Sequence, residues 1–288
     1  PAVKGLSAHG EWSENSVETG EFLLGYENQL GQLTRIPSVE NWNDPSGYLA
    51  AHPQQPEFRA FGLNGTYLVF RKLQQDVEGF WSFVNAHSPQ MPGLNAKQQR
   101  ELFAAKMIGR WRSGAPLALS PDSPGSKPEN KFLYMSDDPD GLSCPIGAHI
   151  RRANPRDSLS MPPQRSLQST RRHRIIRRGR SFCEPARPFT PKNPQFDRGL
   201  YFIALNANLR RQFEFIQQSW LNDPGFNGLD NDADPIAGGN AGKGQFTIQD
   251  KPLNRRISGI QSFVTVKGGG YFFLPSIRAL KFLAHWQG

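Results

Sequence analysis

The stretch DPDGLSCPIGAHIRRANPRD, residues 138–157, is built around one histidine, His149, which stands between a turn-forming acidic run and a group of arginines. An imidazole nitrogen can ligate a metal, and the guanidinium groups of Arg151, Arg152 and Arg156 suit a ligand that carries carboxylates. A single histidine in a loop punctuated by glycine and proline is, however, more often a capping or surface group. Other stretches of the sequence are needed to choose between a metal ligand and a capping or surface histidine.

On the N-terminal side of this stretch, the pattern predicts one strand and two helices. The strand covers residues 66–72 and runs into a helix whose apolar positions are Val77, Phe80, Trp81 and Val84. Asn95 is expected to cap the second helix, which Gly114 and Pro116 end. Its apolar positions at helical spacing are Leu102, Phe103, Met107 and Trp111.

On the C-terminal side, HRIIRRGRSF (173–182) and GLYFIALNAN (199–208) predict adjacent antiparallel strands joined by a proline-rich loop. LRRQFEFIQQSWLND (209–223) predicts the strongest helix, with one apolar face made by Leu209, Phe213, Ile216 and Trp220. Polar loops are expected at 157–170 and 222–245, and a last strand and helix close the chain. Strands interleaved with packing helices indicate an α+β fold with an antiparallel sheet.

Composition narrows the function classes. The chain has 288 residues and a formal net charge of +9, which by itself would suggest nucleic acid as a partner. The basic run at 171–180 alternates with Ile175 and Ile176, so we expect a strand and no nucleic-acid partner. No apolar run is long enough to cross a bilayer, so no membrane partner is expected either. The remaining histidines lack zinc spacing, and His173 is expected to be an uncharged structural or surface residue.

Several stretches, in the same order along the chain, resemble the dye-decolourising (DyP-type) haem peroxidases. They are NGTYLVFRKLQQDV from Asn64, CPIGAHIRRANPRD from Cys144, RHRIIRRGRSF from Arg172, GLYFIALNANLRRQFEFIQQSW from Gly199, FTI from Phe246 and FVTVKGGGYFFLPSIRAL from Phe263. The resemblance implies a ferredoxin-like haem-binding half of a dimeric α+β barrel. Residues 1–60 would then be the connecting tail of the N-terminal half, and residues 61–288 the haem-binding domain.

The resemblance also implies roles for individual residues. His149 would be the proximal ligand to the iron of haem b (iron protoporphyrin IX), and Asn154 and Arg156 would lie beside its propionates. Arg177 matches the distal arginine, while Leu200 and Phe202 match positions that limit the distal pocket. A carboxylate bonded to the other nitrogen of His149 would strengthen its electron donation to iron; Asp234 is the candidate, with Asp230 and Asp232 as rivals.

One family element, the G-x-x-D-G motif that carries the distal acid, is missing from this sequence. We therefore expect the likeness to be confined to the family's C-terminal part, and a companion polypeptide to carry the N-terminal half with that motif. The function implied is a haem peroxidase that reduces hydrogen peroxide and oxidises dyes, phenols or similar one-electron donors. The alternative is a non-catalytic protein that binds haem or an anion and lacks the distal acid.

Overall fold

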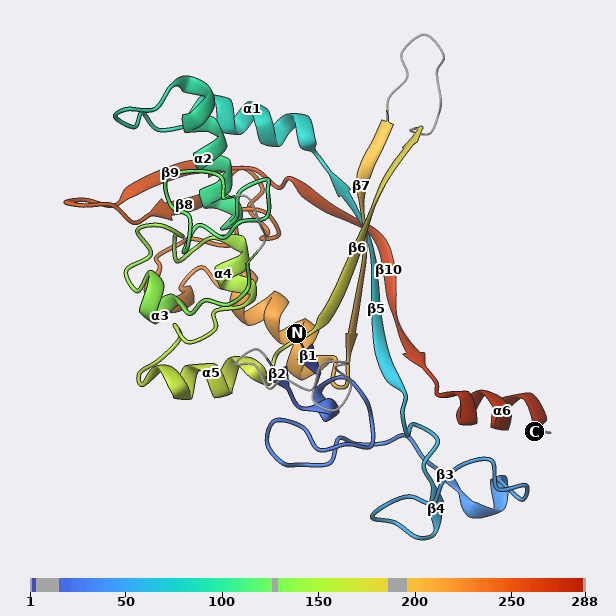
Figure 1. The fold of residues 1–288 in the computed structure, drawn as a ribbon. Helices are drawn as coiled ribbons and strands as arrows, with labels where there is room; N and C mark the ends of the chain where they lie inside the picture. The colour runs from blue at the N-terminus through green and yellow to red at the C-terminus, as the bar shows by residue number, and fades with distance from the viewer. Residues whose placement is uncertain (1, 4–15, 126–128, 186–195, 287–288) are drawn as a thin grey trace.

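The computed structural model describes residues 2–3, 16–125, 129–185 and 196–286, and it is organised around one long antiparallel sheet (Figure 1). The sheet consists of β5 (Thr66–Gln75), β6 (Ile176–Pro185), β7 (Phe196–Asn206) and β10 (Val264–Leu274). The strands lie in the order β10-β5-β7-β6, which in chain order reads fourth, first, third, second. This is the antiparallel order of a ferredoxin-like sheet, so the predicted α+β fold class is confirmed.

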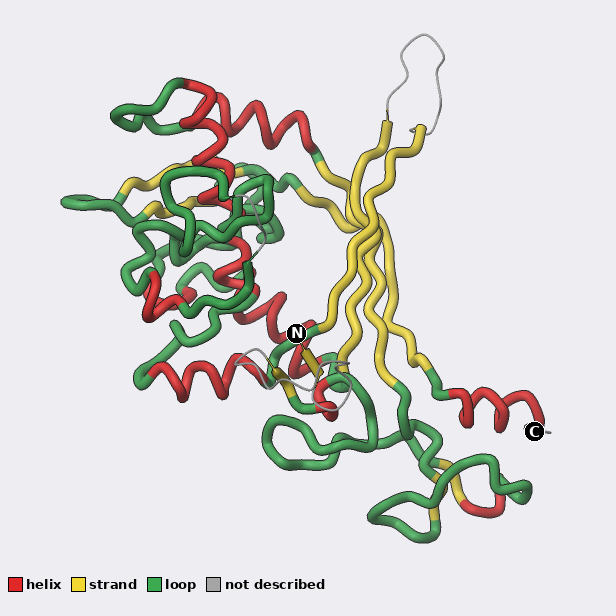
Figure 2. Tube along the Cα trace, viewed as in Figure 1, coloured by secondary structure: helices red, strands yellow, loops and turns green. Residues whose placement is uncertain are grey.

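Helices and short strands complete the structure, and Figure 2 shows that long loops join many of them. The α-helices are α1 (Val77–His87), α2 (Ala96–Ile108), α3 (Tyr134–Asp137), α4 (His149–Ala153), α5 (Pro163–Arg171) and α6 (Ile277–His285). Short 3-10 turns are η1 (Thr19–Glu21), η2 (Asn41–Asn43) and η5 (Phe226–Gly228), and π-helical segments are η3 (Arg210–Glu214) and η4 (Ile216–Leu221). The short strands are β1 (Ala2–Val3), β2 (Ser16–Val17), β3 (Val39–Glu40), β4 (Phe58–Arg59), β8 (Gly244–Ile248) and β9 (Arg255–Ile260).

The register of the sheet determines which side chains share a face. Arg177 pairs with Ala204, and Gly179 pairs with Phe202. Because successive residues of a strand point to opposite faces, Arg177 and Phe202 lie on one face and Arg178 lies on the other. The ring of Phe213, from η3, packs on Phe202 with centroids 6.1 Å apart. The face of Arg177 is therefore the one covered by η3, and we call it the helix-side face.

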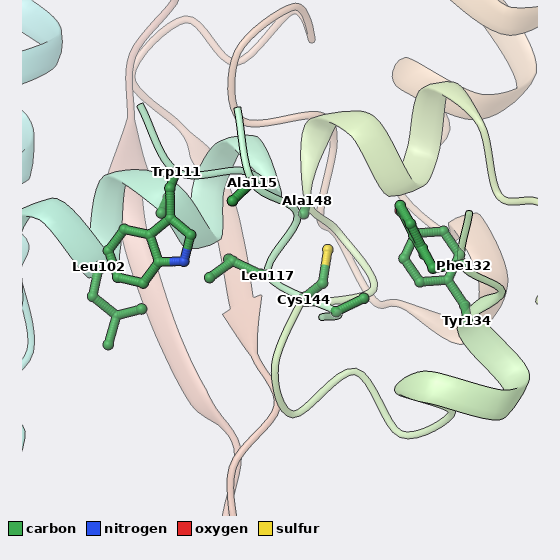
Figure 3. Close-up of a cluster of buried hydrophobic side chains, with 10 residues drawn as sticks. Leu102, Trp111, Ala115, Leu117, Phe132, Tyr134, Cys144 and Ala148 are labelled. Carbon is green, nitrogen blue, oxygen red and sulfur yellow. The ribbon is translucent and has the colours of Figure 1, made fainter. Parts of the chain in front are cut away.

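Helices α1, α2, α4 and α5 lie on one side of this sheet (Figure 1). A buried cluster in this body joins α2 to the segment that precedes His149 (Figure 3). Cys144 and Ala148, which are 1% and 0% exposed, pack there together with Leu102, Trp111 and Leu117. Burial of such side chains stabilises the packing by roughly 25 cal/mol for each Å² of apolar surface removed from water. The cluster thus fixes where α4 begins.

The structure corrects several expected boundaries. Residues 163–171 form α5, whereas a polar loop was predicted over 157–170; Pro163 at the first helical position is compatible with a helix start. Helix α2 ends at Ile108 because Gly109 takes a left-handed conformation (φ 93°), earlier than the predicted stop at Gly114. The predicted helix at 209–223 is present, but it is wound as the π-helical segments η3 and η4.

The structure does not test the remaining expectations about the loop between β6 and β7 and the division of the chain. Residues 186–195, most of the predicted proline-rich loop between β6 and β7, lie outside the described residues. The division of the chain at residues 60 and 61 stays a prediction. Within the described ranges, no helix is long and apolar enough to cross a membrane.

The capping box of α2 generates a first prediction. The side chain of Asn95 accepts from the backbone N–H of Gln98 at 3.0 Å, and the Gln98 side chain accepts from the N–H of Asn95 at 2.9 Å. Asn95→Ala should lower the free energy of unfolding by about 1 kcal/mol, because the first turn loses a hydrogen-bond acceptor. Chemical denaturation checks this. The control Lys97→Ala, on the exposed surface of the same helix, should change stability by less than about 0.5 kcal/mol; equal losses would contradict the capping role.

Candidate functional site

The turn that leads into His149 is held by Asp138. Its carboxylate accepts from the backbone N–H groups of Ser143 at 3.0 Å and Cys144 at 2.8 Å. The buried Arg151, two residues beyond His149, donates from Nη1 to the Asp138 carboxylate at 3.2 Å and to the Cys144 carbonyl at 2.9 Å. The chain is therefore closed on itself around residues 138–151, and this places His149 at the first position of α4.

His149 is bonded to a buried carboxylate. Its Nδ1 lies 3.0 Å from Oδ2 and 3.1 Å from Oδ1 of Asp234. The side chain of Asp234 is 0% exposed, whereas that of His149 is 27% exposed. Because Nδ1 is engaged, Nε2 is the ring nitrogen left for a ligand. A histidine fixed through one nitrogen by a carboxylate is the arrangement found at many metal-binding imidazoles.

Asp234 is itself fixed by the loop after η4. Its Oδ1 accepts from the backbone N–H groups of Ile236 at 2.9 Å and Ala237 at 2.7 Å. Burial acts to raise the pKa of Asp234, but His149 and these two N–H donors outweigh it, so the pKa lies below its usual value. The carboxylate therefore stays ionised beside the imidazole.

The other two candidate aspartates have different surroundings. Asp232 is buried and accepts from the backbone N–H of Thr247 at 2.7 Å, in strand β8. Asp230 is 85% exposed, and its carboxylate lies 3.7 Å from the guanidinium of Arg256. Of the three, Asp234 is the residue whose carboxylate contacts His149.

Arg152 connects α4 to the loop that carries Asp234. Its guanidinium is 0% exposed and donates to the carbonyls of Trp220 and Asp232, both at 2.8 Å, and to that of Asp223. Arg151 and Arg152 thus bind carbonyl and carboxylate groups of the protein itself. The sequence alone suggested that these arginines could face a bound carboxylate, and their observed contacts show that both are engaged within the fold.

The sheet supplies the residues opposite α4. Arg177, Leu200 and Phe202 share the helix-side face, since Arg177 pairs with Ala204 and Leu200 with Ser181. The π-helical segment η4 connects this face to α4, because Arg152 donates to the Trp220 carbonyl. Figure 1 shows α4 on one side of the sheet, and the contact of Arg152 with η4 indicates that this is the helix-side face, on which Arg177 lies.

Four guanidinium groups interact electrostatically in pairs: Arg110 with Arg156 and Arg177, and Arg174 with Arg156 and Arg177. We call these four residues the arginine cluster. Burial, together with the charges of Arg156, Arg171 and Arg177, lowers the pKa of Arg174 to about 10. Burial also lowers the pKa of Arg110, and the charge of Arg177 adds to the effect. Like charges gathered in this way favour the binding of an anion among them.

The predicted propionate residues lie at the end of α4. Asn154 is half-buried and ends the helix, with its backbone N–H donating to the Ile150 carbonyl at 3.0 Å. Arg156 is buried, donates to the carbonyls of Asn130 at 3.0 Å and Phe132 at 2.8 Å, and lies over the Phe132 ring. Both residues keep their predicted role only as a proposal.

Sequence reasoning missed Arg110 and Arg174. Arg174 stands three residues before Arg177 in a run already recognised as basic, so the charge pattern could have suggested it. Arg110 follows the end of α2, and nothing in the local pattern signals its position. His173 agrees with its expected structural role: burial lowers its pKa, and its ring stacks on Phe215 at 3.9 Å. Among the residues that the structure describes, no group of three or more His, Cys, Asp or Glu could hold a metal ion.

Known proteins resemble this chain in sequence and in fold. No family model matches the chain. The dye-decolorizing peroxidase msp1 of Mycetinis scorodonius is 31% identical over an alignment of 306 positions that covers 98% of this chain and 54% of that protein. A dye-decolorizing peroxidase of Mycena epipterygia is 33% identical over 99% of this chain and 55% of its own length. A solved structure of an ancestral D-type dye decolorizing peroxidase superposes with a TM-score of 0.74 and 32% identity, covering 98% of this chain and 59% of that one.

The chain is similar to the dye-decolorizing peroxidases in sequence and in fold. It spans about half the length of the curated family members that it matches. The expectation that the likeness is confined to a C-terminal part is not supported, because the matches run over 98% and 99% of this chain. The expected companion polypeptide is contradicted as well. These peroxidases are single chains, and each match covers almost the whole of the present chain.

The contact between His149 and Asp234 generates a second prediction. Asp234→Asn should lower the free energy of unfolding by about 1–3 kcal/mol, because an amide cannot accept from Ile236, Ala237 and His149 as a buried carboxylate does. Chemical denaturation of the chain measures the change. The matched control, Asp230→Asn on the exposed part of the same loop, should stay within about 0.5 kcal/mol of the parent. Similar losses for both variants would contradict a special role for Asp234.

Proposed function

We propose that this chain is the haem-holding part of a peroxidase that reduces hydrogen peroxide and oxidises dyes, phenols or similar one-electron donors. The likeness to dye-decolorizing peroxidases in sequence and fold supports the reaction class. The single observation that carries the proposal is the contact of His149 Nδ1 with the buried Asp234 carboxylate. It leaves one imidazole nitrogen for an axial ligand bond, and a buried anion sustains that bond.

The donor set fits haem b. A haem needs a neutral imidazole nitrogen for the iron, which Nε2 of His149 can supply, and cationic groups for its two propionates. The arginine cluster supplies the cations, because its members weaken one another's charged state and would gain from anionic partners. Asn154 and Arg156 are the proposed propionate neighbours, as the family resemblance implies. Bound haem would supply the redox-active iron for the reaction.

Arg177 is proposed to act on peroxide. Arg177 is exposed on the helix-side face, and Leu200 and Phe202 lie on the same face of the adjacent strand. A preorganised cation in a site that excludes water stabilises negative charge as it develops on the departing oxygen. Leu200 and Phe202, both half-buried, would restrict the size of molecules that reach the same place.

Asp234 is proposed as a positioning residue. By accepting from Nδ1–H, its carboxylate fixes the tautomer in which Nε2 carries no proton and can bind iron. The same bond increases the electron donation of the imidazole. Arg152 supports this arrangement indirectly, since it fixes the carbonyl of Asp232, two residues before Asp234.

The ligand role of His149 yields a third prediction. His149→Ala should remove the axial nitrogen, so that haem added to the purified chain gives little or none of the Soret absorbance that the parent chain gives. The matched control, His285→Ala, removes an exposed histidine that stacks on Tyr48 at the opposite end of the fold. It should bind haem like the parent. Full haem binding with unchanged absorbance in His149→Ala would overturn the assignment.

The proposed role of Arg177 yields a fourth prediction. In the haem-loaded chain, Arg177→Leu should keep the haem content but slow the reaction with hydrogen peroxide by about 100-fold to 1,000-fold, the usual effect of removing one preorganised group. Stopped-flow absorbance measures the rate. Arg178→Leu is the matched control, because the sheet register places that side chain on the opposite face. If Arg178→Leu slows the reaction as much as Arg177→Leu, the assignment is wrong.

A further inference from the structure

A cavity of about 350 Å³ lies beside α2, between Lys106 near the end of that helix and Met91 and Pro92, which precede its capping box; neither His149 nor Asp234 lines it. Its apolar wall consists of Met91, Pro92, Leu142 and Ile248. Its charged wall consists of Lys106, Lys251, Arg255 and Asp250. Ligand sites are typically concave, mostly apolar and about 300–1,000 Å³ in volume, with few charged groups. This cavity is at the small end of that range, which suits a single ring.

Lys106 is unusual among these residues because a lysine is rarely so deeply buried. The residue is 9% exposed, and its Nζ donates to the carbonyls of Leu142 at 2.9 Å and Ser143 at 3.2 Å. Two carbonyl dipoles bind the ammonium group, which has three N–H donors. Burial lowers the pKa of Lys106, and the negative groups that oppose this include Asp138 and Asp250. A buried ammonium bound only by neutral oxygens favours an added anion.

The remaining charges of the cavity wall are unequal. The Asp250 carboxylate is engaged by Arg255, whose Nε donates to it at 2.7 Å, and by the backbone N–H of Lys251 at 2.9 Å. The Lys251 ammonium lies 3.9 Å from the Asp140 carboxylate, and both of those side chains are largely exposed. The wall thus carries three cationic side chains and one carboxylate. A ligand with one negative charge would reduce this excess.

We propose that this cavity binds a small aromatic carboxylate, with the ring against the apolar wall and the carboxylate toward Lys106. The ring size follows from the volume and from the apolar residues, and the charge follows from the excess of cations. The carboxylate takes a hydrogen bond from the ammonium group of Lys106, a charge-assisted contact that is stronger than a neutral one.

The cavity is joined to the turn before His149 by two side chains. Lys106 donates to the carbonyls of Leu142 and Ser143, and the side chain of Gln249 accepts from the backbone N–H of Ile146 at 2.9 Å. The cavity wall and the segment that leads into α4 therefore share these hydrogen bonds. Neither His149 nor Asp234 lines the cavity.

Isothermal titration of the haem-loaded chain with benzoate tests the proposal, with benzyl alcohol as a neutral ligand of similar size. Benzoate should bind, and benzyl alcohol should bind at least about tenfold more weakly, since a charged hydrogen bond is worth more than about 1.4 kcal/mol. Lys106→Met should weaken benzoate binding by at least about tenfold. The Soret band should not shift on binding, whereas benzoate bound at the proposed haem site would shift it.

Two further variants keep the test decisive. Lys97→Met, on the exposed surface of the same helix, should leave benzoate binding unchanged. Leu142→Trp keeps Lys106 but fills the cavity from its partly exposed edge, and it should abolish benzoate binding even if Lys106→Met fails to fold. Equal affinity for benzoate and benzyl alcohol, a shifted Soret band, or undiminished binding by Leu142→Trp would each overturn the proposal. Isothermal titration measures the heat of benzoate binding, whereas the haem prediction for His149 is tested by Soret absorbance. Failure of benzoate to bind would therefore not affect that prediction.

Discussion

The structure around α4 depends on a carboxylate held without exposure to water beside an imidazole. An isolated buried carboxylate is costly, and here the cost is offset by two backbone N–H groups and by His149. The arrangement requires two loops far apart in sequence to meet. Arg151 donates to the Cys144 carbonyl in the loop before His149, and Arg152 donates to the Asp232 carbonyl in the loop that carries Asp234. Both arginines are buried side chains of α4. Adjacent arginines on one short helix thus bring Asp234 to His149.

The same logic explains how charge is distributed over the protein. Arginines that meet carboxylates or carbonyls inside the fold, such as Arg151 and Arg152, have a structural role. Arg110 and Arg156 of the arginine cluster also donate to carbonyls, but the cluster brings like charges together, and burial and this repulsion both lower the pKa of Arg174. An assembly of that kind is stable only within a well-packed framework, and it gains stability when an anion is bound. The hydrogen bonds around α4 and the excess of positive charge near Arg177 are the two features on which the proposal of a bound anionic group rests.

Much of this could be predicted from the sequence where the signal is local. The alternation in β6 and β7 and the capping residue Asn95 are local patterns, and each gave the correct element. Family likeness suggested Asp234, but only folding could show that its carboxylate, and that of neither Asp230 nor Asp232, reaches His149. The arginine cluster was only partly foreseen, because Arg110 and Arg174 approach Arg177 through tertiary packing. The start of α5 was missed because its sequence, rich in proline and serine, resembles a turn.

The imidazole fixed by Asp234 is proposed to be an axial ligand of haem iron. Resonance Raman spectroscopy of the haem-loaded chain in the ferrous state tests it most directly, because the iron–imidazole stretching band reports both the bond and the charge on the imidazole. We expect this band in the parent chain, and a shift to lower frequency in Asp234→Asn, where the anionic partner of Nδ1 is lost. A haem complex without the band, or with a band that Asp234→Asn leaves in place, would contradict the account.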